Sequence, residues 1–548
     1  MTFVRSLFKS RLPLFFLIPY AAVMIFSGLG DSALQMDEGQ DTFVSTTILK
    51  YGVPMHSDGL NRTMGFADIY DGIFIYRTWF PYYFQAFSIW ALGQTTFAAR
   101  LPFAIYGLLS VCAIYFLALK LSRNKIIAVL ASLFLASSIP ALVLFRAARY
   151  FSLPILFTIL MLYFYIDLFE SGKKWRPWVF IAVSICYFHS MYVEFVSTSL
   201  GIVCHLILNR KLADGENIKR LFYGFAGIAL INLPWLIVIL PVFSNIIHAQ
   251  EISNNAIDTS VTGHGKHLLS FLFQLNNYIF PFILLPLLLA KTLKPYGKEV
   301  QLLLCCALSV ILVATLHPIP SQFYITACFP PLFILLAMMI VEGVPYGPKT
   351  KAPLALALVA TNILHVGPLL PLKPLIEKNA VWFEKSIYLE GAYGTFMREA
   401  AISSIFHKYL YEITHPYSGP LDAVLEFFKA RGKAGETCYI SSEGDAFAYY
   451  TGMKLVRKNE ISSKSRPDWI VLRSGNISIE GNEPPRSSFE ARLREIIRSG
   501  PYKKFVLSSP VDRVNNAYEI QIHKFQTLPM GEITIYRLEK DETPHSPR

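Results

Sequence analysis

Long apolar stretches separated by short polar connections fill the first two thirds of the chain. A helix needs roughly 20 mainly apolar residues to cross a bilayer core. We therefore predict about 11 membrane-spanning helices, near residues 12–29, 101–119, 126–144, 152–170, 177–191, 196–209, 221–243, 268–290, 299–316, 323–342 and 352–372. The stretch "TWFPYYFQAFSIWALG" at 78–93 is the main ambiguity, but Pro81 and its many aromatic residues favour a helix lying at the membrane surface.

The basic residues of the loops select one orientation of these helices. With the N-terminus inside, the inner connections carry basic clusters, at 5–11, 120–125, 173–176, 210–220, 291–298 and 349–351. The outer loops hold few basic residues before the last span, so the positive-inside rule predicts a cytoplasmic N-terminus. An odd number of spans then places the C-terminal part outside, which is the periplasm if the membrane is the bacterial inner membrane.

After about residue 415 the pattern becomes that of a soluble domain. "GPLDAVLEFFKARGKAGETCYISS" predicts a helix that begins at Pro420, a turn and a strand, and "RPDWIVLRS", "KKFVLSS" and "GEITIYRL" predict further strands. A helix is expected near 487–499. The domains are thus a transmembrane domain over 1–372 with an outer loop and surface helices over 30–100, a connecting segment over 373–414, a small outer-face α/β domain over 415–540, and a tail over 541–548.

Composition supports a membrane protein and narrows its partners. The chain is 53% hydrophobic and 16% charged, which excludes an ordinary soluble enzyme. Its formal net charge of +12 would suit nucleic acid, but the basic residues lie in clusters between apolar segments. We therefore expect membrane lipids as partners and no nucleic acid. The seven cysteines show no disulfide framework and no metal-binding spacing.

Three carboxylates, Asp37, Glu38 and Asp41, follow the first apolar segment. The stretch "DEGQDTFVSTTILKYG" also predicts an acid-started amphipathic helix that ends at Gly52. Asp37 and Glu38 can therefore act as a general base, bind a divalent cation, or cap the helix. Their spacing alone leaves all three roles open.

The second candidate is "LFRAARYFSLP" at 144–154, at the outer junction of two spans. Arg146 and Arg149 lie on one face of any helix, with Tyr150 beside them, and a guanidinium among apolar residues needs an anionic partner. The planar fork of arginine suits a phosphate. The alternatives are that the arginines reach lipid headgroups or pair with Asp37 or Glu38. Other polar residues at membrane depth are Glu194, Gln322 and Tyr324.

These motifs occur in the order found in a known family. "DEGQD" after a first span, "ILKYGVP", "WFPYYFQAF", "FAARLPFAIYGLLSVCAIYFLALKL", "RAARYFSLPILF" and "QFYITACFPPLFILLA" resemble the polytopic C-type (GT-C) membrane glycosyltransferases. Protein O-mannosyltransferases and lipid A aminoarabinose transferases are members. The resemblance covers roughly residues 10–345, and it rests on the ordered set rather than on any single motif.

The resemblance implies an activity and roles for the candidate residues. In the family, an acidic residue of the first outer loop, matching Asp37 with Glu38 beside it, takes part in catalysis. The donor is a sugar on polyprenyl phosphate, transferred with inversion at the outer face. Arg146, Arg149 and Tyr150 would hold the donor phosphate. No cofactor is certain, and a divalent cation on Asp37 or Glu38 stays open. Where relatives have "RY" before the late prolines, this chain has "SQFYITACFPP", so Gln322 and Tyr324 are weaker candidates.

The sequence thus predicts an α-helical polytopic membrane glycosyltransferase whose acceptor hydroxyl belongs to a cell-envelope glycan, lipid A, another lipid or a protein. Two alternatives remain. A transporter or flippase of a lipid-linked saccharide would show inverted repeats and broken spans with polar groups at the midplane, and neither pattern is evident in the sequence. A non-catalytic assembly protein would keep its function without Asp37.

Overall fold

The structure of the chain is a computed structural model. It describes residues 12–63, 72–74, 77–170, 175–210, 215–253, 260–280, 283–289, 293, 296–317, 322–343, 347–361, 365–366, 370–381, 402–403, 405–416, 418–433, 435–462, 465–473, 487–510 and 530–539. The predicted tail over 541–548 and much of the predicted connecting segment over 373–414 lie outside these residues.

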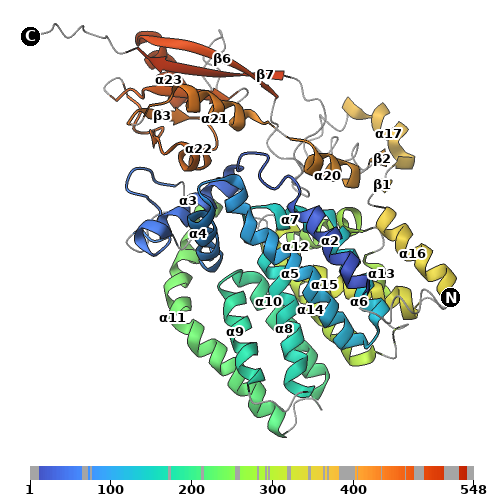
Figure 1. The fold of residues 1–548 in the computed structure, drawn as a ribbon. Helices are drawn as coiled ribbons and strands as arrows, with labels where there is room; N and C mark the ends of the chain where they lie inside the picture. The colour runs from blue at the N-terminus through green and yellow to red at the C-terminus, as the bar shows by residue number, and fades with distance from the viewer. Residues whose placement is uncertain are drawn as a thin grey trace, which may run out of the picture.

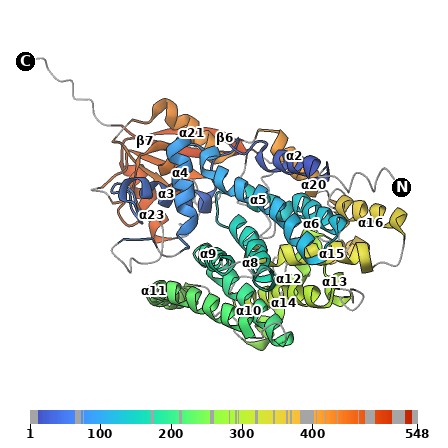
Figure 2. The ribbon, with the colours of Figure 1, turned by 60° about the horizontal axis from the view of Figure 1, so that its bottom comes forward.

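Helices dominate the described residues up to 360 (Figure 1). The first is α2 (Leu12–Phe26), and the outer loop adds α3 (Met36–Tyr51) and α4 (Phe80–Leu92). The remaining helices are α5 (Thr96–Ser122), α6 (Lys125–Ser137), α7 (Ile139–Arg146), α8 (Ser152–Glu170), α9 (Arg176–Phe188), α10 (Tyr192–Leu208), α11 (Gly215–Ser253), α12 (Val261–Gln274), η2 (Leu275–Ile279), α13 (Leu285–Leu288), α14 (Gly297–Ala314), η4 (Gln322–Tyr324), η5 (Thr326–Cys328), α15 (Phe329–Met338), η6 (Met339–Gly343) and α16 (Pro348–Ala360). Figure 2 shows α11 along one edge of the bundle, beside α9.

In the described part of the chain, five helices are long and apolar enough to cross a membrane. They are α5, α8, Leu221–Pro241 of α11, α14 and the continuous stretch Thr326–Gly343. The bent pair α6 and α7 makes six if it counts as one span, and α2, α9 and α10 are shorter apolar helices. The helical, polytopic architecture is therefore confirmed, while the count of eleven stays a prediction.

The predicted span over 126–144 is broken. Its two halves, α6 and α7, meet at 63°. Ser138 between them has extended backbone, and Pro140 in the first turn of α7 lacks the N–H that would continue a helical ladder. The bend carries Arg146 and the following turn toward the start of α8.

The helices of the outer loop form where the sequence predicts them. Helix α3 starts at Met36 and ends at Gly52, whose φ of 76° is left-handed and suits glycine. Helix α4 begins beside Pro81 and packs on α3 and α5. With 13 residues, α4 is too short to cross a membrane unaided.

The described C-terminal residues contain a five-stranded mixed sheet in the order β4-β3-β5-β7-β6. Strand β3 pairs in parallel with β4 and β5, and β7 pairs antiparallel with β5 and β6. The strands of this sheet are β3 (Thr437–Ile440), β4 (Lys454–Leu455), β5 (Trp469–Arg473), β6 (Tyr502–Pro510) and β7 (Met530–Leu538). The helices after α16 are α17 (Lys373–Lys378), α20 (Ile405–Thr414), α21 (Pro420–Arg431), α22 (Gly444–Thr451) and α23 (Ser488–Ser499). A small separate strand pair, β1 (His365–Val366) and β2 (Ile402–Ser403), and the turn η7 (Leu370–Leu372) precede α20. A soluble, periplasmic setting for this region stays a prediction.

This α/β region packs directly on helix α3 through α22 (Figure 1). The contact is close because a Cβ added at Gly39 would lie 2.5 Å from Cβ of Ala446. Hydrogen bonds flank it: the Leu34 amide donates to the Tyr450 hydroxyl at 3.1 Å, and the Asn61 amide group bonds the backbone of Met453 and Leu455. The hydrophobic core also continues from the bundle into α21 and α22. The α/β region therefore fixes the position of α3.

Candidate active site

Helix α3 presents the three acids in its first turns, at the positive end of its dipole. Asp37 and Asp41 are four residues apart and so share one face. Glu38 points to another side, where it meets α5 and the turn after α7. One short helix thus carries two separate carboxylate environments.

Glu38 lies in a saturated, buried ion pair. Its side chain accepts two hydrogen bonds from Arg100 of α5, at 3.0 and 2.8 Å, and further bonds from the amides of Ala148 and Gln35. Glu38 is 4% exposed and Arg100 is 6% exposed. Burial alone would raise the pKa of Glu38, but Arg100 and these hydrogen bonds outweigh it and lower the pKa. With both oxygens occupied by donors, Glu38 ties α3 to α5 and to the turn after α7, and its direct part in catalysis stays a prediction.

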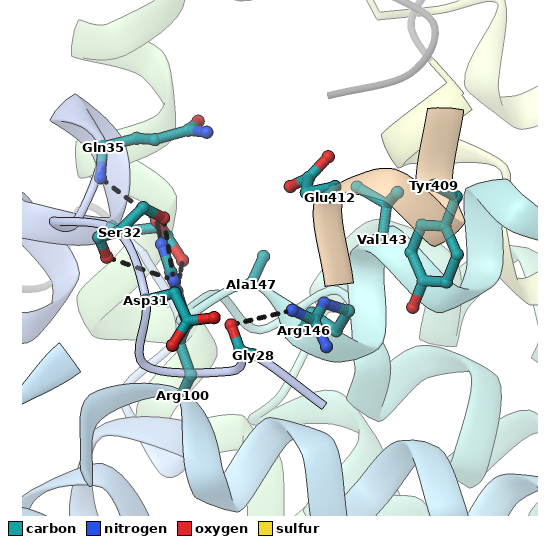
Figure 3. Close-up of a pocket in the computed structure, with 11 residues that line it drawn as sticks. Gly28, Asp31, Ser32, Gln35, Arg100, Val143, Arg146, Ala147, Tyr409 and Glu412 are labelled. Atoms are coloured by element: carbon teal, nitrogen blue, oxygen red, sulfur yellow. Dashed lines mark hydrogen bonds and ion pairs between the residues drawn. The ribbon is translucent and has the colours of Figure 1, made fainter. Parts of the chain in front are cut away.

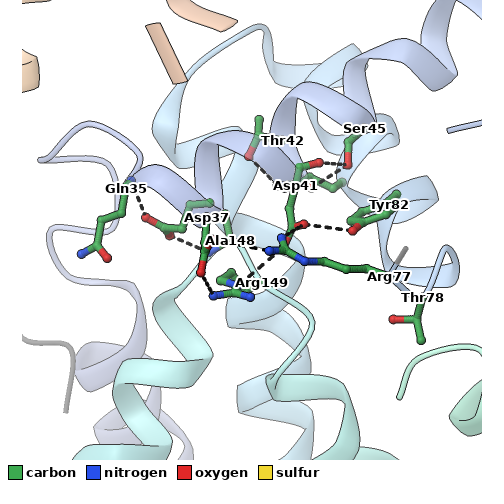
Figure 4. A network of polar contacts seen from close by, with 12 residues as sticks. Gln35, Asp37, Asp41, Thr42, Ser45, Arg77, Thr78, Tyr82, Ala148 and Arg149 are labelled. Carbon is green, nitrogen blue, oxygen red and sulfur yellow. Dashed lines mark hydrogen bonds and ion pairs between the residues drawn. The ribbon is translucent and has the colours of Figure 1, made fainter. Parts of the chain in front are cut away.

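Asp37 and Asp41 meet two arginines in a four-charge cluster, the outer cluster (Figure 4). Arg149 reaches Asp37 at 2.5 Å and Asp41 at 3.6 Å, while Arg77 reaches Asp41 at 2.5 Å and Asp37 at 3.4 Å. The Tyr82 hydroxyl also donates to Asp41 at 2.9 Å. The charge of Arg149 lowers the pKa of Asp37, partial burial opposes this, and Arg77 adds to it. Asp37 is therefore ionised and held between two cations.

The two acids of the outer cluster differ in depth. The Asp37 side chain is 48% exposed, whereas that of Asp41 is 1% exposed. Only Asp37 can therefore meet a substrate hydroxyl without movement of the protein. A carboxylate at a helix N-terminus beside two guanidinium groups suits proton transfer next to an anionic ligand.

Arg77 was not among the predicted site residues. It is held in place by its neighbours: the Thr78 hydroxyl donates to the carbonyl of Ser190 at 2.8 Å, and the Phe80 amide donates to that of His189. These bonds tie the Arg77 loop to the turn between α9 and α10. In the sequence, Arg77 was one of several basic residues in a long loop, and no periodicity singled it out.

Arg146 and Arg149 have different partners, although they were predicted to act together. Arg146 donates to the carbonyls of Ile25, Ser27 and Gly28, so it caps the C-terminal end of α2. Arg149 is the arginine that pairs with Asp37, as one of the alternatives predicted. The structure thus brings together only one of the two predicted arginines with the predicted acid.

A cleft that is partly open to solvent lies on the Glu38 side of α3 (Figure 3). Arg146 and Arg100 line it, and α20 closes one side through Tyr409 and Glu412. Its other lining residues are Gly28, Asp31, Ser32, Gln35, Glu38, Val143 and Ala147. The cleft therefore adjoins the helix that carries Asp37, although Asp37 itself is not among its lining residues.

Tyr150 follows Arg149 in the same turn. The Arg149 guanidinium lies 5.6 Å from the ring centre of Tyr150 and 4.7 Å from that of Phe151. Burial raises the pKa of Tyr150, so the hydroxyl stays protonated. The Phe151 ring stacks on Phe323 of η4 at 4.8 Å. This contact brings the Gln322–Tyr324 segment next to the turn that carries Arg149.

The remaining predicted residues lie deeper or to the side. Glu194 is fully buried and accepts hydrogen bonds from the hydroxyl of Thr326 and the amide of Ala327, at the start of η5 and α15. This is a helix-capping role. Tyr324 stacks on His317 at 3.6 Å. The side chain of Gln322 lies outside what the structure describes.

Asp37 and Glu38, the predicted ligands of a divalent cation, already have other partners in the structure. Both oxygens of Glu38 face hydrogen-bond donors, and both oxygens of Asp37 face arginines. Among the described residues, no three His, Cys, Asp or Glu side chains form a group suited to a metal ion. The site is therefore built from carboxylate and guanidinium groups, and a divalent cation stays an untested prediction.

Comparison with known proteins agrees with this architecture. Residues 77–238 match the family model described as dolichyl-phosphate-mannose-protein mannosyltransferase. Among solved structures, ArnT from Cupriavidus metallidurans in the apo state is similar at 13% identity, with a TM-score of 0.55 over 84% of this chain and 93% of that one. The same protein bound to undecaprenyl phosphate gives 13% identity and a TM-score of 0.52 over 82% and 86%. No curated protein matches the sequence.

These matches confirm the resemblance predicted from the ordered motifs. The chain has the fold of a polytopic C-type (GT-C) membrane glycosyltransferase. The family model begins at Arg77, so it includes Arg77, Arg100 and Arg149 and excludes the three acids of α3. The acids and arginines of the site nevertheless meet in one place in the structure.

Proposed function

We propose that the protein is a membrane glycosyltransferase that moves a sugar from a polyprenyl-phosphate-linked donor to an acceptor hydroxyl. Transfer would take place at the outer, periplasmic face of a bacterial inner membrane, with a cell-envelope glycan, lipid A or a protein as acceptor. The observation that carries the proposal is the half-exposed Asp37 carboxylate held beside Arg149 and Arg77 at the end of the helical bundle. The fold and the polyprenyl phosphate bound by the structural neighbour support it.

The proposed reaction is a single inverting displacement. The acceptor hydroxyl oxygen attacks the anomeric carbon, its proton passes to Asp37, and the bond between that carbon and the phosphate oxygen breaks. The leaving polyprenyl phosphate gains negative charge, which Arg149 and Arg77 stabilise. Glu38 and Arg100 hold α3 in place, and Arg146 fixes the end of α2 beside the reacting groups.

The test is transfer of radiolabelled sugar from a panel of polyprenyl-phosphate sugars to extracted envelope lipids and glycans. Purified wild type is compared with Asp37→Asn, which keeps the shape but cannot take the proton. We expect transfer to fall by about 10² to 10⁴-fold, the usual effect of losing a general base. Asp58→Asn is the matched control, because Asp58 accepts hydrogen bonds from amides of its own loop.

Two outcomes would contradict the proposal. Equal transfer by wild type and Asp37→Asn would remove Asp37 from the chemistry. No transfer with any donor, together with protein-dependent movement of lipid-linked sugar across vesicles, would favour a transporter instead.

A further inference from the structure

Asp37 and Asp41 share the same two arginines from different depths. Arg77 and Arg149 are themselves mostly buried, with side chains 12% and 9% exposed. Each guanidinium therefore has an inner edge toward the buried Asp41 and an outer edge toward the half-exposed Asp37. A planar fork with five donors can hold two carboxylates in this way, which a lysine cannot do as well.

The sharing is uneven. Arg77 is closer to Asp41, at 2.5 Å against 3.4 Å for Asp37. Arg149 is closer to Asp37, at 2.5 Å, while its Nε lies 3.6 Å from Oδ2 of Asp41. At depth, the ion pair Arg77–Asp41 is thus hydrogen-bonded, whereas the ion pair Arg149–Asp41 is longer and makes no hydrogen bond.

The gap between Arg149 and Asp41 involves two buried polar atoms without hydrogen bonds. Within the described part of the chain, both Nε of Arg149 and Oδ2 of Asp41 lack a hydrogen-bond partner. A buried donor and a buried acceptor left unpaired each cost free energy. A small movement of Arg149 toward Asp41 would bring the two atoms to the usual spacing of about 2.7–3.2 Å. Asp41 therefore offers Arg149 a second carboxylate oxygen, already within ion-pair distance but not hydrogen-bonded to it.

We propose that Asp41 is a positioning residue that holds Arg77 and Arg149 from the buried side. On the exposed side, the donor phosphate then replaces Asp37 as the partner of both arginines. The inference rests on the proposed function and deepens it. In the described arrangement both arginines contact Asp37 on the outer side of the cluster. When phosphate replaces Asp37 on the outer side of Arg149, Nε moves onto Asp41, and this hydrogen bond keeps the guanidinium in the cluster.

This exchange links donor binding to the readiness of Asp37. As long as Arg149 and Arg77 hold it, Asp37 is a weak base, because their charges lower its pKa. Transfer of the arginines to phosphate would return the pKa of Asp37 toward its ordinary value. Asp37 would then take a proton most readily when a donor is bound, which limits unproductive chemistry at an empty site.

The test separates binding from turnover in Asp41→Asn. Undecaprenyl phosphate is the binding probe, and kcat is measured with the donor that the wild type uses. Removal of one nearby negative charge should strengthen phosphate binding by roughly tenfold. Turnover should nevertheless fall by at least about tenfold, since Asp41 no longer fixes the two arginines, and the phosphate that they hold, in the reactive position. Weaker phosphate binding together with lower turnover, or no change in either, would overturn the inference.

Tyr82→Phe is the matched control, because it removes a hydrogen bond to Asp41 but leaves the charge. We expect its phosphate affinity and turnover to stay within about threefold of the wild type, because Asp41 keeps its charge and its ion pairs with both arginines. Changes in Tyr82→Phe as large as those in Asp41→Asn would assign Asp41 a merely structural role.

A second measurement avoids any variant that fails to fold. In an experimental structure of the wild type with undecaprenyl phosphate, Nε of Arg149 should hydrogen-bond Asp41 and the contact of Arg149 with Asp37 should be broken. A bound phosphate with the Arg149–Asp37 contact intact would overturn the inference. Sugar transfer by the wild type combined with that result would leave the proposed function standing, so the two failures are distinguishable.

Discussion

Two clusters of similar composition lie at opposite ends of α5 and α8. The outer cluster joins Asp37 and Asp41 to Arg77 and Arg149. The second, the brace cluster, joins two acids at the end of α8 to two bases of α5 and α9, with ion pairs of 2.5–2.9 Å between Lys120, Asp167, Glu170 and Arg176. Each has two acids and two bases, and each has one buried and one half-exposed acid.

The difference lies in what carries the charges. Three helices supply the brace cluster, and among the described residues its half-exposed acid, Glu170, has one ion-pair partner, Lys120. In the outer cluster the half-exposed acid sits at a helix N-terminus, and both of its cations come from loops and turns. Loops positioned by a rigid scaffold are where binding and catalytic groups concentrate. The number of charged residues and their exposure are therefore the same in a reactive site and in a structural brace. The two differ in whether loops or helices carry the charged residues.

The largest stability change is expected from Glu38→Gln, beside the outer cluster. This variant leaves Arg100 buried with an uncompensated charge, and removal of one partner from a buried ion pair costs about 3–5 kcal/mol. Thermal unfolding in detergent measures the loss. Because Glu38 positions α3, transfer should also fall in the surviving folded protein. A Glu38→Gln protein as stable as the wild type would show that the pair does not hold α3.

Asp167→Asn tests the brace cluster, which should affect stability and not sugar transfer. It should destabilise the protein by up to about 3 kcal/mol, somewhat less than Glu38→Gln because Lys120 keeps Glu170 as a partner. The kcat of the folded fraction should equal that of the wild type. The expectation would be contradicted if transfer per folded molecule fell by more than about tenfold. A loss of that size is in the range of lost acid–base catalysis and would mean that the brace cluster takes part in function.

The smallest effect concerns acid pH. The pKa of Glu38 is lowered in the folded protein, so its ionised form stabilises the fold above the ordinary glutamate range near about 4.3. That contribution is lost as the pH falls through the lowered pKa. The melting temperature of the wild type should therefore decrease below about pH 4.3. The melting curve of Glu38→Gln should respond less in this interval, and an equal response of both proteins would contradict the assignment.

Much of the outer site could be predicted, because parts of it are local in sequence. Asp37 follows an apolar segment and starts a helix with a clear end at Gly52, and Arg149 lies between two apolar segments. The partners of the acids could not be predicted in the same way. Arg77 and Arg100 reach α3 across 36 and 62 positions of chain, and only the packing of α4 and α5 selects them.

Glu38 and Arg146 show why residue type alone did not predict the partners of these side chains. Glu38 is adjacent to Asp37 and chemically alike, yet the helix turns it toward Arg100. Arg146 shares a motif with Arg149, but the bend between α6 and α7 brings it to the unpaired carbonyls at the end of α2. In both cases backbone direction decided the partner, and that direction depends on contacts far along the chain.

The contact of α22 with α3 has a consequence for biosynthesis. The bond between Leu34 and Tyr450 joins residues 416 positions apart, and the close approach of Gly39 to Ala446 spans a similar length of chain. At a synthesis rate of about 5–20 residues per second, some 20–80 seconds pass between translation of the two sides. Helix α3 thus emerges from the ribosome well before the surface that seats it, and a growing chain carries an unfinished site until α22 has been made.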